Sequence, residues 1–273
     1  AFLAAFDATT GAEIWRERFD APLMGAPMVA GDRVFVSAGD STLWSLDAAT
    51  GRIDWTLAGT DSLSIMSRTA APALSGDLVV FPTQSGELRA VRRTNGASAW
   101  ATILAGRRTG AAYATISSVT GDPVTDGNRI YAANQSGRLM AVDARSGETL
   151  WSAHEAAYSP VWAVGGSVFL VSDENRMIRL DAATGEPIWA QELPLFADAR
   201  PRRQATIFPQ YGPVLAGGRL WVASGDGLLR GFDPVSGAIG AQIEGPGGAA
   251  SGPIVMNGTL YLLGREGVLH AYR

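Results

Sequence analysis

One short motif recurs along the whole chain of 273 residues and limits what the chain can fold into. It reads apolar-x-apolar-Asp-x-x-Thr/Ser-Gly, followed after three further residues by Trp. Successive motif glycines lie 38 to 52 residues apart. Repeats of this period indicate an array of similar units. The copies are Asp7-Gly11-Trp15, Asp47-Gly51-Trp55, a looser Arg92-Gly96-Trp100, Asp143-Gly147-Trp151, Asp181-Gly185-Trp189, and Asp233-Gly237 with Ala241 in place of Trp.

A second segment lies between the motif copies, and it contains two apolar runs joined by a tight turn. The runs are rich in β-branched and aromatic residues, such as Val34-Phe35-Val36 and Leu220-Trp221-Val222, which favour strands. The turns carry residues that tolerate a positive φ, as two-residue hairpins require. These turns are Gly31-Asp32, Gly76-Asp77, Asp126-Gly127, Gly165-Gly166, Gly217-Gly218 and Asn257-Gly258.

Each repeat therefore supplies four short strands, A to D, which is the pattern of a β-propeller blade. We predict an all-β fold, a β-propeller of four-stranded antiparallel blades that forms a single domain over residues 1–273. A leading pair of strands is expected from Phe2 to Phe19, so the chain holds about six and a half repeats. Six three-strand units follow, starting at Pro27, Pro72, Pro123, Pro160, Pro213 and Pro253.

The motif also predicts its own local structure. An Asp carboxylate at the start of a turn accepts N–H groups of the residues ahead of it, and the Gly takes a conformation that a side chain would forbid. The Trp falls on the outermost strand of the blade, where its large flat ring can cover the seam between neighbouring blades. We therefore interpret the recurring Asp and Trp residues as structural.

Composition argues against several kinds of site. The chain has no Cys and only two His, His154 and His270, so it offers no thiolate and little basis for a Ser-His-Asp arrangement. The net charge of −4 argues against nucleic acid as a partner. No apolar run is long enough for a membrane-spanning helix. We expect a protein that is not an enzyme, with no catalytic residues, no cofactor and no metal site.

The segments Ala8–Trp15 and Ala144–Trp151 are similar to PQQ-type propeller repeats, and the chain as a whole resembles the BamB family of propeller lipoproteins. The loop Ser62–Arg68 is the more specific element of this resemblance. The resemblance implies eight blades, so that one to two blades would precede Ala1. It also implies a non-catalytic periplasmic scaffold in outer-membrane β-barrel assembly, attached to the outer membrane by an anchor absent from this sequence.

Three connections between repeats are longer than the others, at residues 59–71, 104–121 and 193–212. All three join strand D of one blade to strand A of the next, so they are expected at one face, where insertions often form partner sites. The resemblance implies that the first two contact a POTRA domain of the barrel insertase BamA. The residues predicted for this contact are Leu63, Ile65, Met66, Arg68, Ser118 and Thr120.

This docking site departs from the family pattern at three positions. The family has Arg where Met66 stands, and acidic residues where Ser118 and Thr120 stand, with Asp122 the nearest acid here. A shifted site and a changed electrostatic contact both remain open. Secondary candidates on the same predicted face are Arg107, Arg108, Arg202, Arg203 and Tyr211.

A further class of partner is an unfolded outer-membrane protein that adds a strand to an open blade edge. Two other functions remain open. One is a different non-enzymatic PQQ-like propeller that binds a periplasmic ligand or partner. The other, ranked last, is a degenerate quinoprotein dehydrogenase, because the resemblance to those enzymes implies a vicinal Cys pair that this chain lacks.

Overall fold

The computed structural model describes residues 1–23, 25–58, 70–83, 85–104, 119–134, 136–198, 200, 202, 204, 206–245 and 247–273. Its named elements are all β-strands, and they fall into two compact units, Ala1–His154 and Glu155–Arg273. No helix among the described residues is long and apolar enough to cross a membrane.

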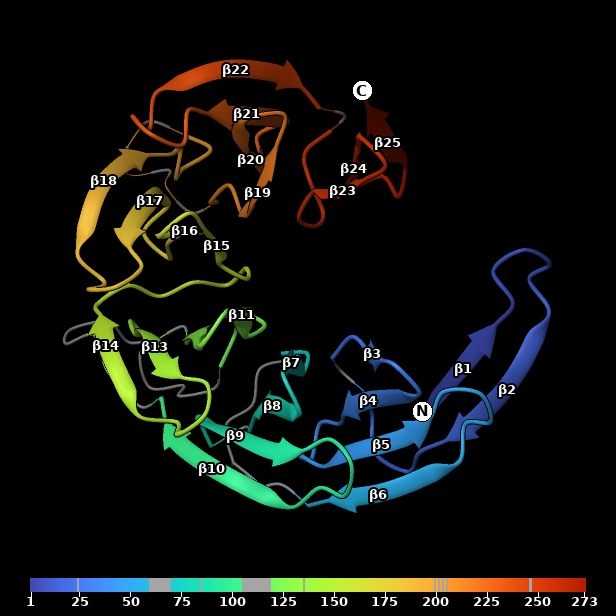
Figure 1. The fold of residues 1–273 in the computed structure, drawn as a ribbon. Helices are drawn as coiled ribbons and strands as arrows, with labels where there is room; N and C mark the ends of the chain where they lie inside the picture. Colours follow the sequence, from blue (N-terminus) through green and yellow to red (C-terminus); the bar gives the residue numbers. More distant parts are fainter. Residues whose placement is uncertain are drawn as a thin grey trace. The chain divides into compact units, whose positions relative to one another are not determined.

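In the first unit a two-stranded sheet is followed by three four-stranded sheets (Figure 1). Each strand pairs antiparallel with its neighbour in sequence, which confirms the predicted leading pair and the four strands per repeat. The strands are β1 (Phe2–Phe6), β2 (Glu13–Arg18), β3 (Met28–Ala30), β4 (Arg33–Ser37), β5 (Leu43–Asp47), β6 (Ile53–Leu57), β7 (Ala73–Ser75), β8 (Leu78–Pro82), β9 (Glu87–Arg92), β10 (Ser98–Ile103), β11 (Val124–Asp126), β12 (Arg129–Ala133), β13 (Leu139–Asp143) and β14 (Thr149–Ala153).

The second unit holds two four-stranded sheets and a three-stranded sheet of the same up-and-down topology. The last sheet has strands A, B and C only, as the sequence predicts. The strands are β15 (Trp162–Val164), β16 (Ser167–Val171), β17 (Arg176–Asp181), β18 (Pro187–Glu192), β19 (Gln210–Ala216), β20 (Arg219–Ser224), β21 (Leu228–Phe232), β22 (Ile239–Glu244), β23 (Ile254–Met256), β24 (Thr259–Leu263) and β25 (Leu269–Tyr272).

Within each unit, the connection that enters strand A lies at the same end of the sheet as the turn between strands B and C. In the first unit Val119, before β11, forms an isolated bridge with Asn134, after β12. In the second unit Ala157 and Ser172 form the equivalent bridge around β15 and β16. The long connections therefore share an end with the B–C turns of their own sheets.

The Asp of each intact motif has the predicted role in its turn. Oδ1 of Asp143 accepts the backbone N–H groups of Arg145 over 3.0 Å and of Ser146 over 2.9 Å. Gly147, next in the turn, has a φ of 74°. The pKa of Asp143 lies below its usual value, mainly because its carboxylate accepts the N–H of Ser146. Burial is the next largest effect and opposes this shift, but the hydrogen bonds from the Arg145 N–H, the Ser146 hydroxyl and the Asn128 amide lower the pKa further. Equivalent Asp turns occur at Asp7, Asp47, Asp181 and Asp233.

These turns predict a loss of stability in acid. A carboxyl whose pKa is lowered on folding stabilises the fold fully above its usual pKa of 3.8, and this contribution disappears as the pH falls through the lowered value. We expect urea unfolding between about pH 5 and pH 2 to show this loss. In an Asp143→Asn variant, which keeps an acceptor oxygen but does not titrate, the pH dependence becomes shallower. An unchanged slope in that variant would contradict the prediction.

Within each unit, the motif Trp residues Trp15, Trp55, Trp100 and Trp189 seal the seam to the next repeat, as predicted. Trp100 is 8% exposed and donates its indole N–H to the backbone oxygen of Ala144 over 3.0 Å. Its ring lies directly over Gly147, where an added Cβ would be 2.6 Å from Cδ2 of the indole. The same arrangement joins Trp15 with Ala48 and Gly51, Trp55 with Arg93 and Gly96, and Trp189 with Pro234 and Gly237.

Apolar residues from facing sheets fill the space behind these seams. In the first unit one buried cluster joins Val80 and Leu88 with Ile130 and Met140, which come from neighbouring four-stranded sheets. The alternation of buried and exposed residues along the outer strands leaves their other face in water. The sheets therefore form a firm base for the connections at their ends.

Candidate functional site

The two long connections of the first unit end side by side, and a carboxylate joins them. Residues 59–69 and 105–118 lie outside the described part of the chain, but the residues that follow them are placed. Ala71 donates its backbone N–H to Oδ1 of Asp122 over 2.8 Å, across 51 positions of sequence. A hydrogen bond to a charged acceptor contributes about 1.5–3 kcal/mol. The C-terminal ends of both connections are therefore held next to each other.

A buried asparagine fixes the start of the second connection. Asn134 is fully buried, and its Nδ2 donates to the backbone oxygen of Leu104 over 2.9 Å. Its Oδ1 accepts the backbone N–H groups of Ser136 and Arg138 over 3.1 and 2.9 Å. Leu104 is the last described residue before position 105. Both ends of this connection thus start from fixed points on the sheet.

Most of the residues predicted for the POTRA contact belong to the undescribed stretches. Leu63, Ile65, Met66, Arg68 and Ser118 lie outside the described residues, and so do the secondary candidates Arg107, Arg108 and Arg203. Thr120 is described: it is half-buried and donates its backbone N–H to the oxygen of Ala133 over 3.1 Å. The predicted POTRA contact stays a prediction. The structure describes only the residues at the ends of the two connections that would form it.

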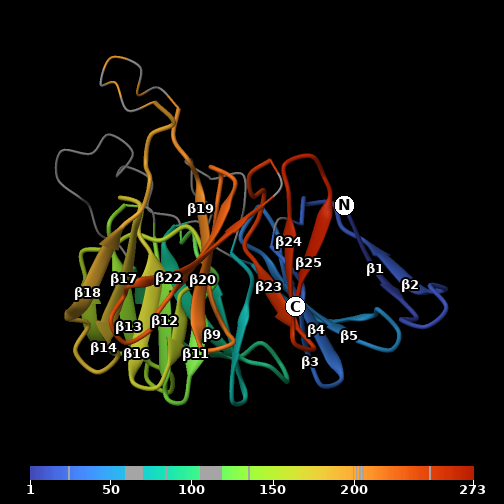
Figure 2. The same cartoon turned by 90° about the horizontal axis from the view of Figure 1, so that it is seen from above.

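The third long connection forms a projecting ribbon between β18 and β19, which we call the 195–208 ribbon. Phe208 donates its N–H to the oxygen of Leu195 over 2.8 Å, and Ala197 donates to Thr206 over 3.0 Å. Between these bonds Phe196 and Ile207 form an antiparallel bridge. Figure 2 shows the coloured, described part of this segment extending beyond the ends of the strands of its unit.

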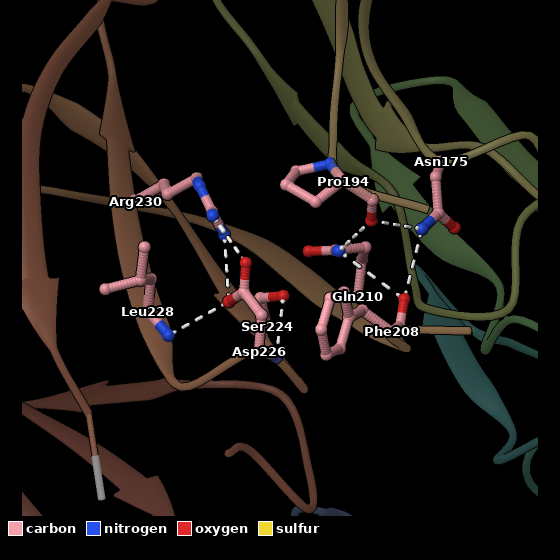
Figure 3. Close-up of polar contacts among 8 residues, drawn as sticks. All are labelled: Asn175, Pro194, Phe208, Gln210, Ser224, Asp226, Leu228 and Arg230. Carbon is pink, nitrogen blue, oxygen red and sulfur yellow. Dashed lines mark hydrogen bonds and ion pairs between the residues drawn. The ribbon is translucent and has the colours of Figure 1, made fainter. Parts of the chain in front are cut away.

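Two buried amides clamp the base of the ribbon (Figure 3). Asn175, in the turn between β16 and β17, donates through Nδ2 to the backbone oxygens of Pro194 over 2.9 Å and Phe208 over 3.0 Å. Gln210, the first residue of β19, donates through Nε2 to the same two oxygens over 2.9 and 3.4 Å. Asn175 and Gln210 are only 7% and 9% exposed. The two chains of the ribbon therefore leave the sheet at fixed positions.

A buried ion pair stiffens the neighbouring turn of the same sheet end. Nη2 of Arg230 lies 2.5 Å from Oδ2 of Asp226, and the two side chains are 7% and 12% exposed. Oδ1 of Asp226 also accepts the N–H of Leu228 over 3.0 Å. Burial raises the pKa of Asp226, but the hydrogen bonds it accepts, led by those from Arg230, outweigh this effect and lower the pKa. Asp226 therefore stays ionised at neutral pH.

The two remaining secondary candidates, Arg202 and Tyr211, differ in how far their side chains are exposed. Arg202 is exposed in the outer part of the third connection. Tyr211 is half-buried and packs on the apolar cluster that contains Leu229 and Leu262. The most exposed apolar side chains of the described ribbon are instead Phe196 and Ile207, at 36% and 54%. The sequence analysis did not single out these two residues. Its only relevant signal was the length of the connection, because the exposure of both side chains depends on which residues pair across the ribbon.

Within each unit, the described polar side chains at the bases of the long connections bind backbone groups of those connections. Among the described residues, no three His, Asp or Glu side chains gather in a group that could hold a metal ion. The polar side chains described above hold the backbone of the connections at their bases. The arrangement presents loop side chains on a rigid support, which suits recognition of a partner.

Comparison with known proteins now identifies the family. A family model described as outer membrane protein assembly factor BamB matches residues 1–191. The chain belongs to the BamB family. BamB of Shewanella oneidensis is 25% identical over 269 residues, which are 98% of this chain and 65% of that protein. BamB of Yersinia pestis is 25% identical over 274 residues, 100% of this chain and 67% of that protein. The chain therefore spans about two thirds of these curated relatives.

A solved BamB structure confirms the predicted fold class. The crystal structure of BamB from Moraxella catarrhalis matches with a TM-score of 0.85 and 22% sequence identity, over 100% of this chain and 78% of that one. The fold is thus an all-β propeller of four-stranded antiparallel blades, as the repeats predict. The number of blades beyond this sequence stays a prediction.

Proposed function

We propose that this protein is a non-catalytic scaffold in the assembly of outer-membrane β-barrel proteins, located in the periplasm at the outer membrane. The observation that carries the proposal is its membership of the BamB family, whose members are named as outer membrane protein assembly factors. Its role is to hold a partner at the connection end of the sheets, without chemistry of its own.

The partner in this proposal is a POTRA domain of the barrel insertase BamA. The hydrogen bond of 2.8 Å between Ala71 and Asp122 supports it, because it holds the ends of the first two connections together. Leu63 and Ile65 in the first connection provide apolar side chains, and Arg68 provides a positive charge beside them. An apolar centre with an adjacent Arg is typical of the residues that dominate protein interfaces.

Binding to the purified POTRA domains tests this function. We expect Leu63→Asp and Ile65→Asp each to weaken the binding of the full-length protein at least about tenfold, since a carboxylate is costly to bury in an apolar contact. Affinity is measured by titration calorimetry. The control is Val29→Asp, which changes an aliphatic residue 67% exposed next to the A–B turn, at the opposite end of its sheet.

Two results would contradict the proposal in different ways. Wild-type protein that does not bind the POTRA domains would overturn the function itself. Wild-type binding that Leu63→Asp and Ile65→Asp leave unchanged would remove the first connection from the contact. An equal loss of binding in Val29→Asp would also remove the first connection from the contact. The loss would then come from the added charge or from misfolding, and not from a lost apolar contact.

A further inference from the structure

The 195–208 ribbon carries an apolar pair on one of its faces. Phe196 and Ile207 are directly opposite each other in the antiparallel bridge, so their side chains project from the same side. They remain 36% and 54% exposed in the described structure. The two side chains together form a small apolar surface on a projecting element, where a partner can cover both at once.

The base of the ribbon is held at a defined position, which lowers the entropic cost of using the bridged pair next to it for binding. Asn175 and Gln210 each donate to the backbone oxygens of Pro194, just before the ribbon, and Phe208, its last residue. Two buried amides thus direct four hydrogen bonds to two carbonyl oxygens at this base. They make the base of the ribbon a rigid mount.

The charge of the ribbon is opposite to that of the whole chain. Residues 193–209 contain three Arg and one Asp, whereas the full chain carries a net charge of −4. The single acid, Asp198, accepts two hydrogen bonds of 3.0 Å from the Arg200 guanidinium. The hydrogen bonds from Arg200 lower the pKa of Asp198. Arg202, which is exposed, and its sequence neighbour Arg203 therefore give residues 193–209 an excess positive charge.

We propose that the 195–208 ribbon is a second docking element, which takes an acidic protein surface with an apolar patch. The order of the residues favours a protein over a membrane. Arg202 lies farther from the base of the ribbon than the bridged pair Phe196 and Ile207, so a flat lipid surface would meet its charge and leave the pair in water. A folded partner that reaches along the ribbon contacts both.

The inference rests on the proposed function in one respect, the identity of the partner: it assigns the acidic surface to the POTRA domains of the insertase. In the full-length protein, Ile207→Asp is expected to weaken POTRA binding about tenfold or more, and the milder Ile207→Ser about threefold. The matched control is Val235→Asp, which alters a valine 74% exposed in a C–D turn of the same unit and leaves affinity unchanged. Urea unfolding verifies that each variant is folded.

A second experiment tests the contribution of charge to binding, with the double variant Arg202→Glu/Arg203→Glu. We expect it to weaken binding about tenfold at low salt and to flatten the salt dependence of the affinity, because exposed charges act over about 10 Å in 0.1 M salt. The control is Arg145→Glu, an exposed arginine in a C–D turn of the first unit, whose affinity and salt dependence stay those of the wild type.

The outcomes separate this inference from the proposed function. If Leu63→Asp weakens POTRA binding and Ile207→Asp leaves it unchanged, the ribbon is not a docking element, but the proposed scaffold function still holds. Wild-type protein that does not bind the POTRA domains overturns the scaffold and this choice of partner with it. Ribbon variants that abolish binding to anionic vesicles, or self-association in sedimentation, while POTRA binding persists, also overturn the inference.

Discussion

Replacing Gly147 with alanine is expected to lower the free energy of unfolding by about 3 kcal/mol, the larger part of it from steric overlap with Trp100. Gly147 has a φ of 74°, which L-residues rarely adopt. In addition, the new Cβ would lie 2.6 Å from Cδ2 and Cε3 of the indole, so ring or turn must move. Urea unfolding followed by Trp fluorescence measures the loss.

Gly11→Ala is the matched control for the first prediction. Gly11 has nearly the same φ, 73°, in an equivalent turn, but no atom lies within 4 Å of the position that its new Cβ would take. It should therefore cost only the backbone strain, about 1 kcal/mol. In a Trp100→Leu background the extra cost of Gly147→Ala should shrink, because the ring is absent. Equal costs for the two glycines would show that the indole contact is unimportant.

The second large effect is expected at the buried ion pair of the second unit. Asp226→Ala leaves the guanidinium of Arg230, 7% exposed, without its carboxylate partner. Breaking a buried pair on one side costs about 3–5 kcal/mol, and we expect about 3 kcal/mol because the site keeps some access to water. Removing both charges with Asp226→Leu/Arg230→Met should be less damaging than the single change, since no uncompensated charge remains.

An exposed pair of the same residue types provides the comparison. Arg92 and Asp77 lie 2.8 Å apart with side chains 58% and 68% exposed. Exposed pairs of this kind contribute about 0–1 kcal/mol, so Asp77→Ala should change the free energy of unfolding by less than about 1 kcal/mol. Denaturant titration of both single variants tests the contrast. Losses of similar size would show that burial of the Asp226–Arg230 pair does not determine its contribution.

The sequence predicts the sheets well because their signals are local. A motif Asp fixes its turn through residues two and three positions ahead, and each hairpin is marked by residues such as Gly31 or Asn257, which the structure places at positive φ. Strand number, strand order and the short first and last sheets follow from counting these turns. Even the Trp seam is predictable, because the outermost strand of one blade must face the next blade.

The bases of the connections were not predictable, because their contacts join residues far apart in the chain. Asp122 holds Ala71 across 51 positions, and Asn175 reaches Phe208 across 33. No local pattern indicates these contacts. Tyr211 is predicted at the partner face, whereas the structure packs its half-buried side chain against an apolar cluster. The side chains that do face water, Phe196 and Ile207, depend on the pairing register of the ribbon.

The indole contacts connect each of these repeats only to the repeat that follows it. Each described seam reaches forward to the turn of the following repeat alone, as Trp15 does to Ala48 and Trp55 to Arg93. Cohesion in such an array is a sum of nearest-neighbour terms, so damage in one repeat is felt by the adjoining repeats and fades beyond them. On heating or under a pulling force, we expect repeats to separate first at the seam where Ala241 stands in place of the motif Trp.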